Sequence, residues 1–172
     1  VLYGNGIVHE QTFDCGAGTV LVALMENLDV DYSTAEEILM SANISGGVVS
    51  REMRWTSEGD NRSFSVMEIN EIIKCSLDVL CEQIDAFFST RYQDKISTAL
   101  TARPISITGE GIVCLKGAAE HISRRLNRIS EIVYPDLPYY DKPNFSSRIG
   151  LLDTATKDCK KGSWFQKIFN VF

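Results

Sequence analysis

One stretch of the chain limits the possible folds more than any other, because apolar residues recur in it at steps of three and four. They are Ile69, Ile72, Ile73, Leu77, Leu80, Ile84, Phe87 and Phe88. An α-helix has about 3.6 residues per turn, so this spacing places them along one face. Ser65 and Glu68 are suited to capping its start. The sequence therefore predicts one helix of roughly seven turns, whose apolar face the rest of the domain must cover.

The composition allows the chain to bury that face in a hydrophobic core. Of 172 residues, 44% are hydrophobic and 23% charged, which is typical of one globular domain or two small subdomains. The net charge of −6 argues against nucleic acid as a partner. Five cysteines without a CxxC pair favour reduced thiols in a cytosolic protein. Two histidines without partners at ligand spacing predict no metal site, and no run of 18 apolar residues occurs.

Turn and capping residues divide the region before the long helix. The expected elements are a hairpin around Asn5-Gly6 within residues 1–14, a helix at 20–28, a helix at 33–43, and strands at 48–56 and 62–64 around a turn at 58–61. Ser33 or Thr34 is expected to cap the second helix, because glutamates follow three residues later.

The region after Pro104 alternates between strand and helix patterns. The expected elements are a strand at 105–109, a helix at 115–128, a strand at 130–135 and a final core helix at 146–155. This alternation predicts an α/β layer. Gly109 and Gly111 follow the first strand, at the place where open α/β sheets bind ligands. From spacing alone, a turn that merely needs glycine explains these two residues better than a binding loop does.

The order of segments resembles the C-terminal half of the actin-like ATPases, and most closely the bacterial cell-division proteins of the FtsA type. The matching features are, in chain order, the hairpin and glycine-rich helix start in VLYGNGIVHEQTFDCGAGTV, the acidic helix with Ala35-Glu36 in STAEEILMSANISG, the long helix in INEIIKCSLDVLCEQI, the adenosine-motif strand and turn in ITGEGIVCLKGAAEHI, and the closing helix in FSSRIGLLDTA. Together they cover nearly the whole chain.

The resemblance implies an α/β fold of the ribonuclease-H-like, actin-like class with an inserted small α+β subdomain. Residues 1–16 and 97–157 would form the core subdomain, 17–96 the inserted subdomain, and 158–172 a linker and an amphipathic tail helix. A first residue other than methionine favours a longer protein or a processed product. The family's phosphate-binding hairpins and catalytic carboxylates are expected upstream, so this chain alone is expected to hold no catalytic residue.

The resemblance also implies a site for ATP with Mg between the glycine turn and the inserted subdomain. The implied cofactor-binding residues are Gly16, Ala17, Glu36, Gly109, Glu110 and Gly111. Glu110 stands where the family usually has a second glycine, and Leu39 stands where it has a lysine that grips the nucleotide. A carboxylate at position 110 would repel phosphates. The whole protein is therefore expected to bind ATP weakly or to use the fold as a scaffold.

The last ten residues form an apolar, two-sided pattern after a lysine-rich segment. At 100° per residue, the apolar residues from Trp164 onward fall in an arc of about 160°, and Ser163 is a suitable N-cap. The residues expected to contact a membrane are Trp164, Phe165, Lys167, Ile168, Phe169 and Phe172. The residues alone leave two possibilities open, a helix docked on the domain's own core or one bound to an anionic membrane. The resemblance favours the membrane.

The resemblance further implies a protein partner for the inserted subdomain. In FtsA-type proteins this subdomain receives the C-terminal tail peptide of the tubulin-like FtsZ. The candidate contacts here are Arg51, Arg54, Arg62 and Lys74, although scattered basic residues are more commonly plain solvated surface. Self-association into a filament is the second expected interaction.

The expected function is therefore that of an actin-like cell-division protein. It would tether the division-ring filament, at the septum, to the inner face of the cytoplasmic membrane as a peripheral cytoplasmic protein. Two alternatives remain: a true ATPase whose turnover drives assembly, and an actin-like scaffold of pilus assembly or a microcompartment that binds proteins and never a membrane.

Overall fold

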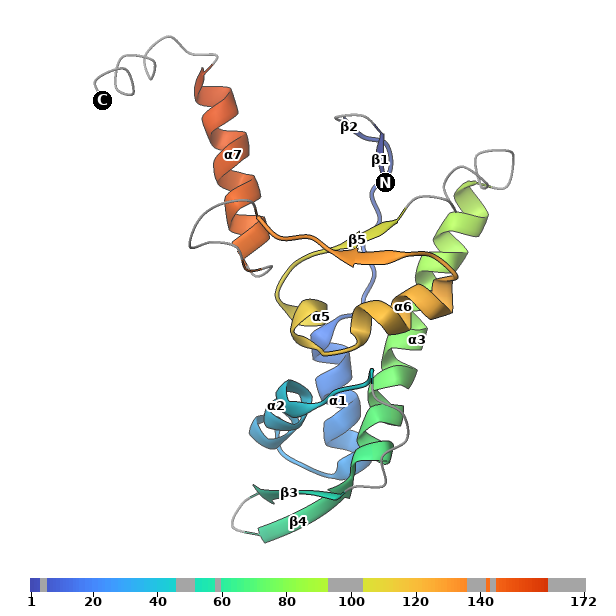
Figure 1. Ribbon diagram of the computed structural model, residues 1–172, viewed down its shortest axis with the longest axis vertical. Helices are drawn as coiled ribbons and strands as arrows, with labels where there is room; N and C mark the ends of the chain where they lie inside the picture. Colours follow the sequence, from blue (N-terminus) through green and yellow to red (C-terminus); the bar gives the residue numbers. More distant parts are fainter. Residues whose placement is uncertain are drawn as a thin grey trace, which may run out of the picture.

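The computed structural model describes residues 1–3, 6–45, 52–57, 60–92, 104–135, 142 and 145–160. Over these residues the chain is a mixed α/β protein (Figure 1). Its helices are α1 (Ala17–Leu28), α2 (Tyr32–Ser41), α3 (Val66–Arg91), α5 (Gly111–Cys114), α6 (Ala118–Leu126) and α7 (Ser146–Lys160). Its strands are β1 (Leu2–Tyr3), β2 (Gly6–Ile7), β3 (Glu52–Ser57), β4 (Asp60–Ser65), β5 (Ile105–Ile107) and β6 (Ser130–Ile132).

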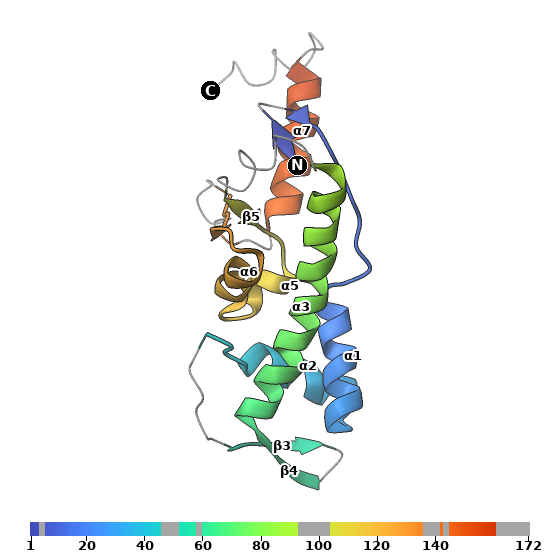
Figure 2. The same ribbon diagram turned by 90° about the vertical axis from the view of Figure 1, so that its right-hand side faces the viewer.

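The long helix α3 is the spine of the molecule, which confirms the main prediction from the sequence. It has 26 residues and follows Ser65 as N-cap, although the Ser65 side chain makes no capping hydrogen bond. Helix α1 lies along its first half, with α2 packed against α1, and α6 lies along its second half (Figures 1 and 2). Its buried apolar residues are Ile69, Ile73, Leu77, Leu80 and Cys81. They follow the three- and four-residue spacing that the sequence showed, because one face of the helix is covered from Ile69 to Cys81, whereas Ile84, Phe87 and Phe88 are only partly buried.

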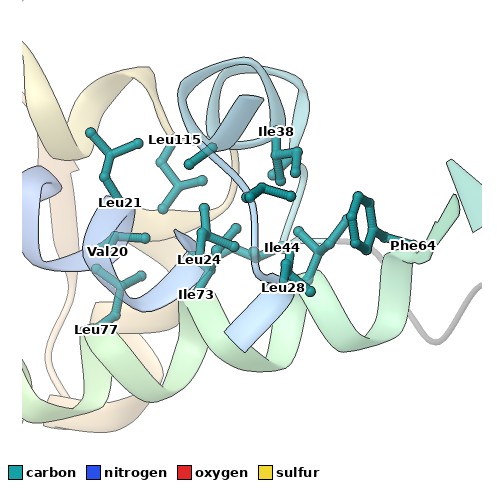
Figure 3. Close-up of a cluster of buried hydrophobic side chains, with 14 of the residues drawn as sticks. Val20, Leu21, Leu24, Leu28, Ile38, Ile44, Phe64, Ile73, Leu77 and Leu115 are labelled. Atoms are coloured by element: carbon teal, nitrogen blue, oxygen red, sulfur yellow. The ribbon is translucent and has the colours of Figure 1, made fainter. Parts of the chain in front are cut away.

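The principal core lies where α1, α2 and α3 meet (Figure 3). Its largest fully buried side chains are Leu24, Ile38, Ile44 and Ile73. Leu115 and Ala118, which lie beyond β5, also belong to this core, although they are more than 40 positions from Ile73 in sequence. The core formed by α1, α2 and α3 is therefore completed by residues that follow β5.

The starts of both helices before α3 differ from the prediction. Helix α1 begins at Ala17, three residues earlier than expected, because the Gly16 N–H donates to Thr19 Oγ1 at 3.2 Å. The prediction that Ser33 or Thr34 caps α2 is wrong. The cap is Asp31, whose Oδ1 accepts from the Thr34 N–H at 2.7 Å, since a carboxylate is a strong acceptor for a free helix N–H. Helix α2 ends at Ser41 rather than near Asn43.

Both predicted hairpins are confirmed. Strands β1 and β2 pair antiparallel with Leu2 opposite Ile7. Strands β3 and β4 pair antiparallel from Glu52 opposite Ser65 to Ser57 opposite Asp60, so they extend closer to the turn than the sequence indicated. The β3–β4 hairpin lies at one end of the molecule, and β1–β2 and α7 lie at the other (Figures 1 and 2).

The α/β layer predicted after residue 104 is confirmed as a parallel pair of strands joined through helices. Strand β5 pairs with β6 in register Ile105 to Ser130 and Ile107 to Ile132, with α5 and α6 between them. The two carboxyl ends are tied together, because Thr108 Oγ1 donates to the Val133 carbonyl at 3.2 Å. Both strands therefore end beside the turn that begins at Gly109.

Helix α7 is longer than expected, since it continues to Lys160 rather than ending near residue 155. The prediction of a core helix here is wrong, because Leu151 and Leu152 on α7 are 72% and 61% exposed. The predicted tail helix at 163–172 lies outside the described residues. Within the described part of the chain, no helix has both the length and the apolarity needed to cross a membrane.

Candidate functional site

The structure brings the glycine turn and the start of α1 into direct contact. Gly109 has a φ of 104°, in the left-handed region that favours glycine, and the chain turns there from β5 into α5. Gly111 lies against α1, because a Cβ built on it would be 3.1 Å from the Ala17 Cβ. Two groups of candidate residues, separated by more than 90 positions in sequence, thus meet at one junction.

This junction encloses only a small cavity. Its volume is about 20 Å³, which is room for about one water molecule. The lining residues are Cys15, Gly16, Ala17, Val20, Leu39, Ser76, Leu77, Leu80, Gly111, Ile112 and Leu115. None of these lining residues is charged. The cavity is therefore a narrow apolar space shared by α1, α2, α3 and α5.

Leu39 and Ile112 are two of the larger side chains that line this cavity. Leu39, on α2, and Ile112, on α5, are both partly buried and pack against the principal core. Ile112 also packs against the smaller core cluster of Cys81, Ile107 and Ile122. The short helix after the glycine turn therefore joins the two cores of the molecule.

Some of the candidate cofactor residues lie away from this cavity. Glu36 and Glu110 are exposed and are not among the lining residues. Gly109 is likewise not among the lining residues. Of the six residues expected to hold nucleotide, only Gly16, Ala17 and Gly111 line the cavity.

The junction does not fit ATP with Mg. Pockets that bind small ligands commonly enclose about 300–1,000 Å³, and this one has room for about one water molecule. Leu39, in the position of the family's lysine, points apolar atoms into the space instead of a cation. The nearest charge contributed by the turn itself is the carboxylate of Glu110, which would repel phosphates. The chemistry of the lining is that of a packing interface.

A polar cluster that the sequence analysis missed connects α3 with α6. Asp78 Oδ1 lies 2.7 Å from His121 Nε2 and accepts from Arg125 Nε at 2.8 Å. Arg125 also approaches Glu82 at 3.5 Å. His121 is buried, with 8% of its surface exposed. The spacing was available in the sequence, because Asp78 and Glu82 are one helical turn apart and so are His121 and Arg125.

The cysteines next to this cluster are not arranged for nucleophilic chemistry. Burial raises the pKa of Cys81 to about 11, and the Asp78 carboxylate adds to the rise. The thiolate is the reactive form, so Cys81 is held as an unreactive thiol at neutral pH. Cys75 is exposed while Cys81 is buried, as expected for positions six apart on one helix.

The basic residues expected to bind a peptide do not form one cluster. Arg62 donates to the Asp29 carbonyl, lies 3.8 Å from the Asp29 carboxylate and sits 5.4 Å from the centre of the Phe64 ring. Lys74 pairs with Glu71 at 3.7 Å. Arg54 is exposed on β3, and Arg51 lies outside the described residues. Arg62 therefore links the β3–β4 hairpin to the end of α1.

A larger and shallower groove runs between α1 and α3. Its volume is about 380 Å³, and it is lined by Thr19, Ala23, Asn27, Glu71, Ile72, Cys75, Ser76 and Val79. Small and apolar side chains predominate, and the one carboxylate is the Glu71 group already paired with Lys74. Such a lining suits a packed helix better than a small charged ligand.

Two comparisons with known proteins identify no relative of this chain. Neither a scan against protein-family models nor a search of curated proteins found a match to the chain.

Proposed function

We propose that this chain is the C-terminal half of an actin-like bacterial cell-division protein that tethers the division-ring filament to the inner face of the cytoplasmic membrane. The observation that carries the proposal is the contact between Gly111 and Ala17 beside the ends of a parallel strand pair. The resemblance to FtsA-type proteins predicted that these distant segments lie opposite each other. The mixed α/β architecture and the order of elements agree with that resemblance.

The tail supplies the membrane contact in this proposal. Residues 163–172 contain three phenylalanines, one tryptophan, one isoleucine and one valine. Each large side chain contributes about 1.5–3 kcal/mol when fully buried in an apolar phase. Lys157, Lys160, Lys161 and Lys167 each add about 1 kcal/mol near an anionic surface. This combination of two signals is what stable peripheral binding requires.

The role of a tether does not depend on ATP turnover within this chain. A scaffold needs a rigid body, a filament contact and a membrane anchor, and the packed α1–α2–α3 core provides the body. We propose self-association as the filament contact. We also propose that an acidic peptide, of the kind that the FtsZ tail presents, docks beside Arg51 and Arg54, of which Arg54 is exposed.

Vesicle sedimentation tests the tether. The chain with residues 1–172 is expected to pellet with vesicles rich in phosphatidylglycerol, and a variant ending at residue 161 is expected to stay in the supernatant. The paired substitutions Trp164→Ala and Phe169→Ala should weaken binding strongly, because they remove apolar area from the proposed lipid-facing side. Gln166→Ala and Asn170→Ala, on the other side, serve as the matched control.

Equal pelleting of the full and shortened chains would overturn the proposal. It would favour instead an actin-like scaffold of pilus assembly or a microcompartment, which binds proteins only. Binding that is lost in high salt but unaffected by loss of the aromatic residues would show that the lysines act alone, and the proposed helix would then be wrong.

A further inference from the structure

We infer that the inserted subdomain is closed onto the rest of the chain by permanent side-chain and backbone packing, with Leu39 and Ile112 filling the space where actin-like proteins would place a nucleotide base. The orientation of the subdomain is then independent of nucleotide. The inference rests on the proposed function only for the identity of the ligand that is excluded, because the packing itself is a property of the described residues.

The first support is the apolar contact across the junction. Leu115 and Ala118, 6% and 1% exposed, are members of the same core as Leu24 and Ile38 of the inserted subdomain. A binding cleft between two bodies would leave these side chains on separate surfaces. Here they share one close-packed interior, in which a volume change of even one methylene group affects stability.

The second support is a backbone connection between the same two parts. Asn43 and Lys116 form a parallel bridge, and the Ile44 N–H donates to the Lys116 carbonyl at 2.9 Å. Gly117 allows this close approach, because a Cβ there would collide with the backbone of Ser45. Ile44 itself is 1% exposed, so opening the junction would expose both an apolar side chain and buried backbone groups.

The third support is the polar cluster between α3 and α6. The buried His121 and Arg125 share one carboxylate oxygen of Asp78, with distances of 2.7 and 2.8 Å. Hydrogen bonds that involve a charged group are stronger than neutral ones. Farther along, the Arg128 guanidinium lies 4.2 Å from the centre of the Phe88 ring. Apolar packing, backbone hydrogen bonding and ionic contacts therefore all connect the two parts of the chain at the junction.

The consequence is that the described residues provide no hinge at the place where nucleotide-dependent actin-like proteins would close. Ligand-driven closure requires two arrangements whose free energies differ by only a few kcal/mol, and a ligand that prefers one of them. A junction filled by Leu39 and Ile112 offers a nucleotide no differential contact. Assembly of this protein would then be governed by its concentration and by the membrane rather than by the state of a bound nucleotide.

Hydrogen exchange tests the packing directly. In the protein as its gene encodes it, including any residues before Val1, Leu39→Ala is expected to speed exchange of the Ile44, Leu115 and Ala118 amides by about tenfold or more. Met40→Ala is the matched control, because Met40 is the next residue of α2 and is 60% exposed. Leu39→Met, which preserves volume, should retain protection. If Leu39→Ala does not fold, the smaller truncation Leu39→Val takes its place.

Nucleotide binding provides the second measurement. Millimolar Mg-ATP is expected to leave Tm unchanged, whereas a true binding site would raise it by several degrees. A rise in Tm with ATP, or exchange at the junction that is the same in Leu39→Ala and wild type, would overturn the inference. Vesicle sedimentation is independent of both readouts, so failure here and failure of the proposed tether are distinguishable.

Discussion

At the scale of single residues, Gly117 and Gly150 differ in whether the fold requires glycine, and only the structure shows this difference. Gly117 has a φ of 92° and faces the Ser45 backbone, whereas Gly150 lies within α7 with no atom near its missing Cβ. The first position needs glycine for both conformation and space. The second uses glycine in a helix, where alanine is the better residue.

Gly117→Ala is therefore expected to destabilise the protein by more than about 1–2 kcal/mol, which is the cost of the left-handed conformation alone, before the collision with Ser45 is counted. Gly150→Ala is the same chemical change without either cost, and it should stabilise α7 by about 0.5–1 kcal/mol. Urea unfolding followed by circular dichroism measures both. Equal effects of the two substitutions would contradict the assignment of Gly117 to the Asn43–Lys116 contact.

At the scale of elements, capping decides where α2 begins. The sequence offers Asp31, Ser33 and Thr34 within four positions, and each residue type is a good N-cap. The structure selects Asp31, which accepts from both the Thr34 N–H and the Thr34 hydroxyl, the latter at 3.2 Å. The choice follows from packing, because Thr34 and Ala35 are then turned into the core.

Asp31→Ala should accordingly cost about 1 kcal/mol of stability, since the first turn of α2 loses its acceptor. Ser33→Ala, at an exposed position of the same turn, should change stability by less than about 0.5 kcal/mol. Thermal unfolding of the two variants side by side is the measurement. The reverse order would restore Ser33 as the cap.

At the scale of the whole molecule, the resemblance implies a boundary between an inserted subdomain and a core subdomain, but one hydrophobic core contains residues from both sides of that boundary. The segment 17–96 that the resemblance implies as inserted contains α1, α2, β3, β4 and α3, yet the core that these elements form also contains Leu115 and Ala118. Cooperative units follow shared cores rather than chain segments. The described residues on both sides of α5 are therefore expected to unfold together.

A fragment of residues 17–92 should consequently be less stable than a fragment of residues 15–135. Burying Leu115 alone contributes about 1.5–3 kcal/mol, and the backbone bridge at Lys116 is lost as well. Thermal melts of the two fragments provide the comparison. If both melt at the same temperature, the segment 17–92 is an independent domain, and its packing against Leu115 and Ala118 contributes no stability.

The amino-acid sequence by itself determined the long helix, both hairpins and the alternation of strands and helices after residue 104, because periodicity and turn residues are local signals. The parallel pairing of β5 with β6 joins two distant strands and came from the tertiary structure. The tertiary structure alone decided that Leu39 and Ile112 line the same small cavity, that Asp78 is shared by His121 and Arg125, and that Arg62 is held by Asp29. Each of these contacts joins residues from different elements. Their side chains come within reach only once packing along α3 has set the distance between those elements.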